Sequence, residues 1–198
     1  MLYAAQVNSK SMARVTPHIP ASVPKERLAQ QAEIALASFK AGVCVSANLS
    51  IGQFDSHANN DPDQMKLLPE LLAGIAYTLR RAEALKIRDR LVVVMQSEMG
   101  RTPTYNKGNG KDHWSIGSVM FLGPGIKGNR VIGATDDKQF GVNLNPATLA
   151  TDKDKGLKIR PEHIHESLRE LAGIAAHPHA KKFPLGLTEK EKLKGLWG

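Results

Sequence analysis

The sequence has a single cysteine, Cys44, among 198 residues, so an intrachain disulfide is excluded. Cys44 lies between two valines in an apolar run, which favours a small buried hydrophobic side chain over a nucleophile. Aromatic residues make up only 5% of the chain, so aliphatic side chains must form most of the core. The length suits one domain, with room for a tail.

Long hydrophobic runs are also missing. No stretch approaches the ~20 consecutive apolar residues that a membrane-spanning helix needs. The start of the sequence, MLYAAQVNSKSMARV, lacks the apolar core of a secretory signal peptide. We therefore expect a protein that is cytoplasmic in the form given and has no membrane partner.

The net charge is +8, from 27 Lys and Arg against 19 Asp and Glu, which raises the question of nucleic-acid binding. Most of the basic residues are scattered, and the densest group lies in the stretch 181–194. Aromatic residues do not alternate with basic ones, as a single-strand binder would require. The sequence therefore predicts a solvated basic surface that favours small anionic ligands, and no nucleic-acid partner.

Hydrophobic periodicity predicts alternating helices and strands. Apolar residues recur at three- and four-residue steps in the predicted helices, and β-branched apolar runs form the predicted strands. The predicted helices are 24–40, 63–86, 161–172 and 188–196, and the predicted strands are 43–51, 91–96 and 117–122. This order predicts the α/β class, with a mostly parallel sheet covered by helices on both faces. The expected division is an irregular lead-in at 1–24, one α/β domain at 25–175 and a C-terminal tail at 176–198.

Acidic and imidazole side chains follow the predicted strands. Asp55 and His57 come after strand 43–51, Glu98 after strand 91–96, and Asp112 and His113 lie in the loop that leads to the next strand. Ligands of open α/β sheets bind beyond the carboxyl ends of the strands, so these loops are expected to meet. Two imidazoles and three carboxylates suit a divalent metal such as Zn, Mn or Mg.

Each of these residues also has a purely structural interpretation. Glu98 suits a helix cap, Asp55 suits an Asx turn, and Asp112 suits a hydrogen bond that holds His113. Arg101 and Lys111 are candidates for binding an anionic substrate group, and the planar guanidinium of Arg101 suits phosphate or sulfate.

Four motifs taken together resemble a bacterial family known as domain of unknown function 1501. They are FDSHANN, SEMGRT, NGKDHW and FLGPGIKGN, and the resemblance covers roughly residues 25 to 135. That family is similar to the alkaline phosphatase and sulfatase superfamily, which has a doubly wound α/β fold and uses one or two metal ions to cleave phosphate or sulfate esters. The resemblance implies that Asp55 and His57 supply one metal position and that Glu98, Asp112 and His113 supply the rest.

Family chains are longer than this one, and no residue here matches the superfamily's nucleophile. The chain resembles the C-terminal half of a family member, and a full-length form is expected to be periplasmic. The expected function is a metal-dependent phosphate- or sulfate-ester hydrolase domain acting on a small anionic ester. The alternative is a non-catalytic remnant that binds metal or oligomerises. A truncated sheet would expose edge strands and apolar surface, so a homo-oligomer is expected, or a partner chain that supplies the missing N-terminal half.

Overall fold

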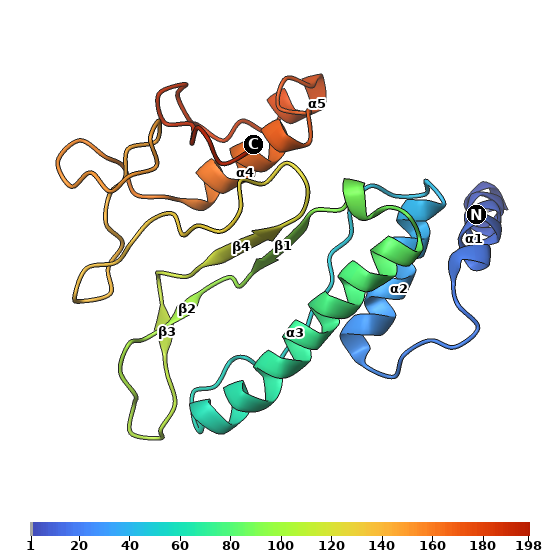
Figure 1. The fold of residues 1–198 in the computed structure, drawn as a ribbon, viewed down its shortest axis with the longest axis horizontal. Coiled ribbons are helices and arrows are strands. Elements are labelled where there is room, and N and C mark those ends of the chain that lie inside the picture. The colour runs from blue at the N-terminus through green and yellow to red at the C-terminus, as the bar shows by residue number, and fades with distance from the viewer. Residues whose placement is uncertain (1) are drawn as a thin grey trace. The chain divides into compact units, whose positions relative to one another are not determined.

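The computed structural model describes residues 2–198 (Figure 1), with side chains from residue 9 onward. The chain divides into two compact units. Unit 1 comprises the residues up to Leu91 together with Thr104–His113, and unit 2 comprises Val92–Pro103 together with Trp114–Gly198. The division expected from the sequence, with boundaries after residues 24 and 175, stays a prediction.

Unit 1 is helical. Its elements are α1 (Leu2–Val15), η1 (Thr16–His18), α2 (Arg27–Lys40), α3 (Asn60–Ala84) and η2 (Arg88–Arg90). Helices α2 and α3 agree with the two predicted from periodicity, although α3 begins earlier than expected and carries Pro69 inside it. Gly74 of α3 faces Leu28 of α2, and a Cβ atom at Gly74 would lie 2.4 Å from Leu28 Cδ2. The missing side chain therefore lets the two helices approach closely.

A polar network crosses the interface between α2 and α3. Glu33 is 1% exposed, and its carboxylate accepts bonds from Arg81 Nε at 2.8 and 3.0 Å. The Tyr77 hydroxyl donates to the same carboxylate, and burial together with this bond raises the pKa of Tyr77 to about 12. Arg81 also donates to the carbonyl of His18 at 2.7 Å, which joins η1 to the helix pair. A buried carboxylate is tolerated here because its charge is paired and hydrogen-bonded.

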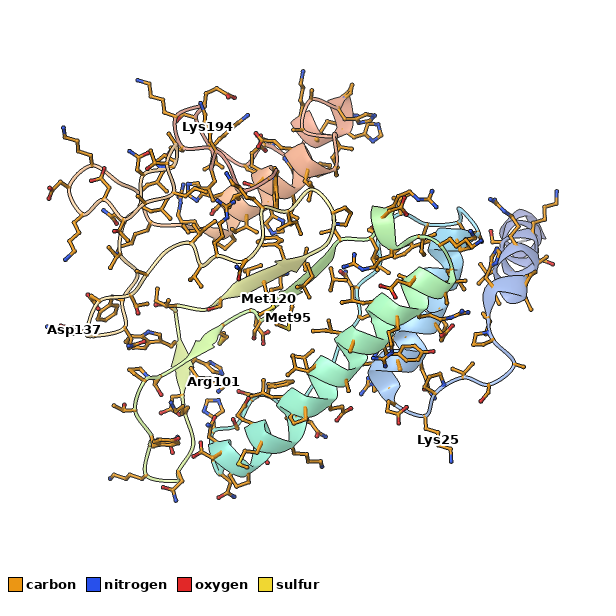
Figure 2. All side chains as sticks on the ribbon, viewed as in Figure 1. Lys25, Met95, Arg101, Met120, Asp137 and Lys194 are labelled. Atoms are coloured by element: carbon orange, nitrogen blue, oxygen red, sulfur yellow. The ribbon has the colours of Figure 1, made fainter. Side chains whose placement is uncertain are left out.

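Unit 2 contains little regular structure. Strand β1 (Val93–Gln96) pairs antiparallel with β4 (Val119–Leu122), and Met95 lies opposite Met120 (Figure 2). Two very short strands, β2 (Gly100–Arg101) and β3 (His113–Trp114), form a second two-stranded sheet, and the boundary between the units falls within β3, so that His113 belongs to unit 1. The helices are α4 (Pro161–Leu171) and the single-turn α5 (Pro178–Lys181). The buried core consists of Leu144, Leu193 and Leu196.

The predicted fold class is wrong. Within residues 2–198 the structure has five α-helices and two small antiparallel sheets, and it has no parallel sheet covered by helices on both faces. Periodicity located β1 and β4, but it carries no information about which strands pair. The connection between β1 and β4 also contains no helix, whereas the crossover between neighbouring parallel strands usually does.

Two predicted elements are not formed. The apolar stretch 43–51 belongs to no strand among the described residues. The amide of Gln31 takes the place of a neighbouring strand at Ser50, where it donates to the carbonyl at 2.9 Å and accepts from the N–H at 2.8 Å. The stretch 188–196 has the expected bond from Thr188 N to Glu191 Oε2, at 2.8 Å, but no helix follows it.

An ion-pair cluster holds this last stretch instead. Lys192 reaches Glu189 at 2.7 Å and Glu166 of α4 at 3.1 Å. Hydrogen bonds to these two carboxylates, Glu189 foremost, raise the pKa of Lys192. Leu193 and Leu196 are thereby directed into the core of unit 2.

Among residues 2–198, no helix combines the length and apolar character that a bilayer crossing requires.

His163 makes the stability of unit 2 depend on pH. It is 1% exposed, its Nδ1 accepts from Arg160 N at 2.9 Å, and burial holds the pKa below the usual 6.5. As the pH falls, the imidazole of His163 is therefore protonated at a higher pH in the unfolded chain than in the folded chain. The contribution of neutral His163 to the free energy of unfolding is present above about pH 6.5 and is lost as the pH falls below it.

The substitution His163→Gln keeps an acceptor near Arg160 N but removes the imidazole. We predict that the free energy of unfolding falls less between about pH 8 and about pH 5.5 in this variant than in wild type. Urea unfolding followed by tryptophan fluorescence measures this loss, because Trp114 and Trp197 both belong to unit 2. The exposed neighbour His165 is the control, and His165→Gln should keep the wild-type pH dependence. Equal pH dependence in wild type and His163→Gln would contradict the prediction.

Candidate metal centre

Two segments of unit 1 that are distant in sequence lie side by side at the start of α3. They are the stretch 54–60 and the loop 104–113, and we call their pairing the clasp. Ala58 and Asn109 form an antiparallel bridge. Lys111 N donates to Ser56 O at 3.0 Å, and Asn60 N donates to Asn109 O at 2.9 Å. These backbone bonds fix the alignment of the two segments and of the side chains that they carry.

The clasp depends on a very close approach at Gly110. A Cβ atom there would lie 1.9 Å from the carbonyl carbon of His57, so only glycine fits. Asn59 and Asn109 adopt left-handed backbone conformations, with φ of 50° and 54°. Asparagine tolerates this region better than most residues, because its short polar side chain can form local hydrogen bonds.

Polar contacts attach the clasp to the first turns of α3. Ser56 is 3% exposed, and its hydroxyl donates to Asn60 Oδ1 at 2.8 Å. Gln64 Nε2 donates to Ser56 Oγ at 3.1 Å and to Phe54 O at 3.3 Å. The backbone on both sides of Asp55 is therefore held by a helix, which limits the positions that this carboxylate can reach.

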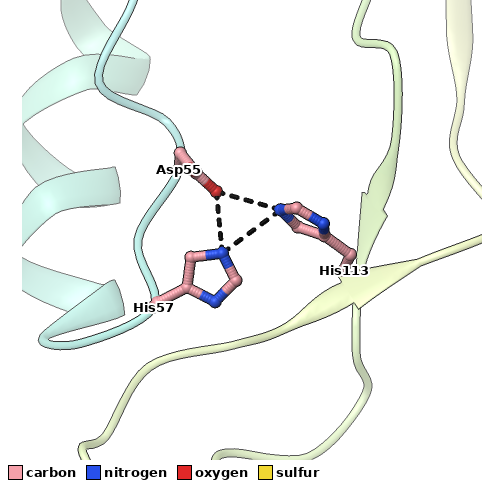
Figure 3. A group of neighbouring side chains, drawn as sticks. All are labelled: Asp55, His57 and His113. Carbon is pink, nitrogen blue, oxygen red and sulfur yellow. Dashed lines mark hydrogen bonds and ion pairs between the residues drawn. The ribbon is translucent and has the colours of Figure 1, made fainter.

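Asp55, His57 and His113 bring one ligand atom each to a common point (Figure 3). His57 Nε2 lies 3.1 Å from Asp55 Oδ1 and 3.2 Å from His113 Nε2. His113 Nε2 lies 3.2 Å from Asp55 Oδ1, which closes the triangle. All three side chains are exposed, so solvent and small solutes reach the centre.

Asp112 fixes the orientation of His57 from behind. Its Oδ1 lies 3.0 Å from His57 Nδ1 and also accepts from Asn106 Nδ2 at 3.0 Å. These two bonds, with that to His57 the larger contribution, lower the pKa of Asp112, so it is an ionised acceptor. His57 Nδ1 must then carry the proton, which leaves a lone pair on Nε2 facing Asp55 and His113.

This arrangement fits a divalent cation. Ligand atoms about 2.0–2.1 Å from a tetrahedral zinc ion are about 3.3 Å apart, close to the edges of the observed triangle. A single proton can form a hydrogen bond between only two of the three atoms, whereas a cation placed between them can be bound by all three. A carboxylate behind a metal-binding imidazole is also the usual second-shell arrangement, because it sets the tautomer and raises the basicity of the ring.

A second contact closes the outer end of the clasp. The Tyr105 hydroxyl donates to Asp61 Oδ1 at 2.7 Å, which joins the loop to the first turn of α3. This bond lowers the pKa of Asp61 and raises the pKa of Tyr105. The Lys111 ammonium lies 4.8 Å from the centre of the Tyr105 ring, so a positive charge sits on the same loop as Asp112 and His113.

The structure therefore brings three of the five predicted ligands together. Asp112 lies beside them and holds a histidine, as its structural interpretation required, but that histidine is His57 instead of the expected His113. Glu98 follows β1 in unit 2, where its carboxylate accepts from Ser97 Oγ at 3.3 Å. Arg101 belongs to β2, also in unit 2. Metal binding by Glu98 and substrate binding by Arg101 and Lys111 stay predictions.

Two residues of the clasp were missed from the sequence. Asn106 and Gly110 lie in the run NKGNG, which we interpreted only as a polar loop. The signal was present, because closely spaced glycines and asparagines mark positions where two backbones approach or a chain turns sharply.

Comparison with known proteins agrees with the motif resemblance. The model of a family described as "Protein of unknown function (DUF1501)" matches residues 6–171. The chain therefore belongs to the DUF1501 family. No curated protein and no solved structure matches it.

We predict that Gly110→Ala opens the clasp. Its Cβ would overlap the His57 backbone, and relieving this overlap should destabilise unit 1 by about 1–3 kcal/mol, as overpacking usually does. Gly108→Ala in the same loop is the control, because its Cβ would lie 3.5 Å or more from its neighbours. Amide hydrogen exchange at Lys111 and Asn60 measures the effect. Unchanged protection of both amides in Gly110→Ala would contradict it.

Proposed function

We propose that unit 1 binds a divalent metal ion through Asp55, His57 and His113, and that this ion serves hydrolysis of a phosphate or sulfate ester. The observation that carries the proposal is the triangle of two imidazole nitrogens and one carboxylate oxygen, with Asp112 holding the correct tautomer of His57. Membership of a family that resembles the alkaline phosphatase and sulfatase superfamily supports the hydrolytic part of the proposal.

The ligand set favours zinc among the candidate metals. Two histidines, one carboxylate and a water molecule form a frequent catalytic zinc site, in which the fourth position stays open to water or substrate. Magnesium prefers octahedral sites built mainly from oxygen atoms, and two imidazoles suit it poorly. Manganese accepts mixed nitrogen and oxygen ligands and is therefore the second candidate.

The chemistry of such a site does not require a side-chain nucleophile. A bound divalent ion lowers the pKa of a coordinated water toward neutrality and polarises a phosphoryl or sulfuryl oxygen. The exposed position of the three ligands lets a small ester reach the ion. The ammonium of Lys111 on the same loop and the net charge of +8 both favour an anionic substrate.

A second candidate function is metal binding without catalysis, in a protein that assembles with further chains. Apolar side chains on α3 favour this candidate, because Met65, Leu68 and Leu72 are 76%, 46% and 58% exposed. Exposed apolar surface of this kind often marks a protein–protein contact. The assembly would be a homo-oligomer or a complex with a chain that supplies further parts of the site.

We predict that the purified chain, stripped with a chelator, binds zinc with a stoichiometry of one ion per chain. Asp55→Ala, His57→Ala and His113→Ala should each weaken binding by more than the roughly 100-fold that outer-shell changes reach. Competition with a chromogenic chelator measures the affinity. His18→Ala is the control, because the contact of His18 with Arg81 uses its backbone carbonyl and is retained. Wild-type affinity in all three ligand variants would remove this metal site from consideration.

Hydrolysis requires a separate test. We predict that the zinc- or manganese-loaded chain turns over a chromogenic aryl phosphate or aryl sulfate, and that Asp55→Ala loses this activity by about 100-fold or more together with the metal. Activity is measured after chelation and reconstitution with Zn, Mn or Mg, one at a time. Tight metal binding without turnover of either ester would support the non-catalytic candidate.

A further inference from the structure

We propose that Asn106 is a positioning residue that sets the tautomer of His57, and through it the lone pair that His57 offers to a metal. The part that concerns affinity rests on the proposed metal site. The part that concerns the tautomer can be measured in the chain without metal. Asn106 lies in the loop of the clasp, six residues before Asp112, and does not itself belong to the ligand triangle.

The side chain of Asn106 uses all of its hydrogen-bonding capacity. Its Oδ1 accepts from Gly108 N at 2.9 Å and from Gly110 N at 3.0 Å. Its Nδ2 donates to His57 O at 2.9 Å and to Asp112 Oδ1 at 3.0 Å. Two N–H groups face one end of the amide and two oxygens face the other, so only one orientation of the amide satisfies all four partners.

The first pair of bonds closes the loop. Asn106 N donates to Gly110 O at 2.9 Å and Asn109 N donates to Asn106 O at 3.2 Å, so backbone and side chain close the same turn. This turn brings Gly110 against the backbone of His57. The position of Lys111, Asp112 and His113 relative to stretch 54–60 therefore depends on it.

The second pair of bonds orients the acid that holds His57. Asp112 Oδ1 accepts from Asn106 Nδ2 and faces His57 Nδ1, each at 3.0 Å. An amide N–H can only donate, so it requires an accepting oxygen of Asp112 at this point. That oxygen in turn requires a proton on His57 Nδ1, which leaves the lone pair on Nε2, the atom that faces Asp55 and His113.

The substitution Asn106→Asp separates the two roles. A carboxylate still accepts from the N–H groups of Gly108 and Gly110, so the turn can be retained. It has no N–H to donate to Asp112 or to His57 O, and it places a second negative charge beside Asp112. The expected result is that Asp112 turns away from His57 and that the ring populates both neutral tautomers.

The experiment compares wild type, Asn106→Asp and Asn106→Ala with the matched control Asn145→Asp. Asn145 also accepts backbone N–H groups in a turn, from Ala147 at 2.9 Å and Thr148 at 3.2 Å, but it belongs to unit 2. Long-range proton–nitrogen NMR of the chelator-treated chain identifies the protonated nitrogen of His57. Competition with a chromogenic chelator measures zinc affinity, and far-UV circular dichroism checks the fold.

We expect His57 in wild type and in Asn145→Asp to carry its proton on Nδ1. In Asn106→Asp we expect a shift toward the Nε2–H tautomer and a fall in zinc affinity of about 10–100-fold, the range known for outer-shell partners of metal-binding histidines. A role confined to closing the turn through Oδ1 would be rescued by Asn106→Asp and would leave the tautomer unchanged. A wild-type tautomer in folded Asn106→Asp therefore overturns the proposal.

Two further outcomes are also decisive. If wild type binds no zinc but the tautomer shifts in Asn106→Asp, the proposed function fails and the role of Asn106 stands. If the Asn106 variants do not fold, Asp112→Ala decides instead, because it leaves Asn106 and its turn in place. A wild-type tautomer in Asp112→Ala then overturns the proposal, because Asn106 reaches the His57 ring only through Asp112.

Discussion

The backbone contact between stretch 54–60 and loop 104–113 is the constraint on which the candidate site depends. Gly110 lies so close to the carbonyl carbon of His57 that no side chain fits between them. The contact places His113 beside Asp55 and His57, and it lets Asp112 reach the back of the His57 ring. No charge is buried when these three side chains come together, because all of them remain in contact with solvent. Assembling the site therefore costs little desolvation, and backbone hydrogen bonds supply the precision.

Sequence analysis predicted which side chains come together better than it predicted the architecture. Helices α2, α3 and α4 and strands β1 and β4 followed from periodicity, because one apolar face or run is a local property of the chain. The parallel sheet did not form, because pairing between strands is decided by contacts that periodicity does not contain. Asp55, His57 and His113 were chosen because the ends of parallel strands should meet. They do meet, but a pairing of two non-regular segments brings them together.

The parts of the site that could not be predicted are those that depend on long-range geometry. Nothing local in the sequence shows that Asp112 holds His57, which lies 55 residues away, instead of its neighbour His113. Asn106 and Gly110 have the residue types of an ordinary turn, and only the structure shows that the turn is pressed against a second backbone. Glycine and asparagine residues in a loop can therefore position the side chains of a site as well as form a simple turn.

The anchoring of Ser56 by Asn60 and Gln64 has a thermodynamic consequence for helix α3. The ends of helices open and close more readily than their middles, so the first turn of α3 is a natural point of local unfolding. An ion that binds only when this turn is formed would stabilise it in proportion to RT ln(1 + [L]/Kd). The cation concentration would then determine how often the first turn of α3 unfolds. The rate of this local unfolding would in turn limit how quickly the cation dissociates.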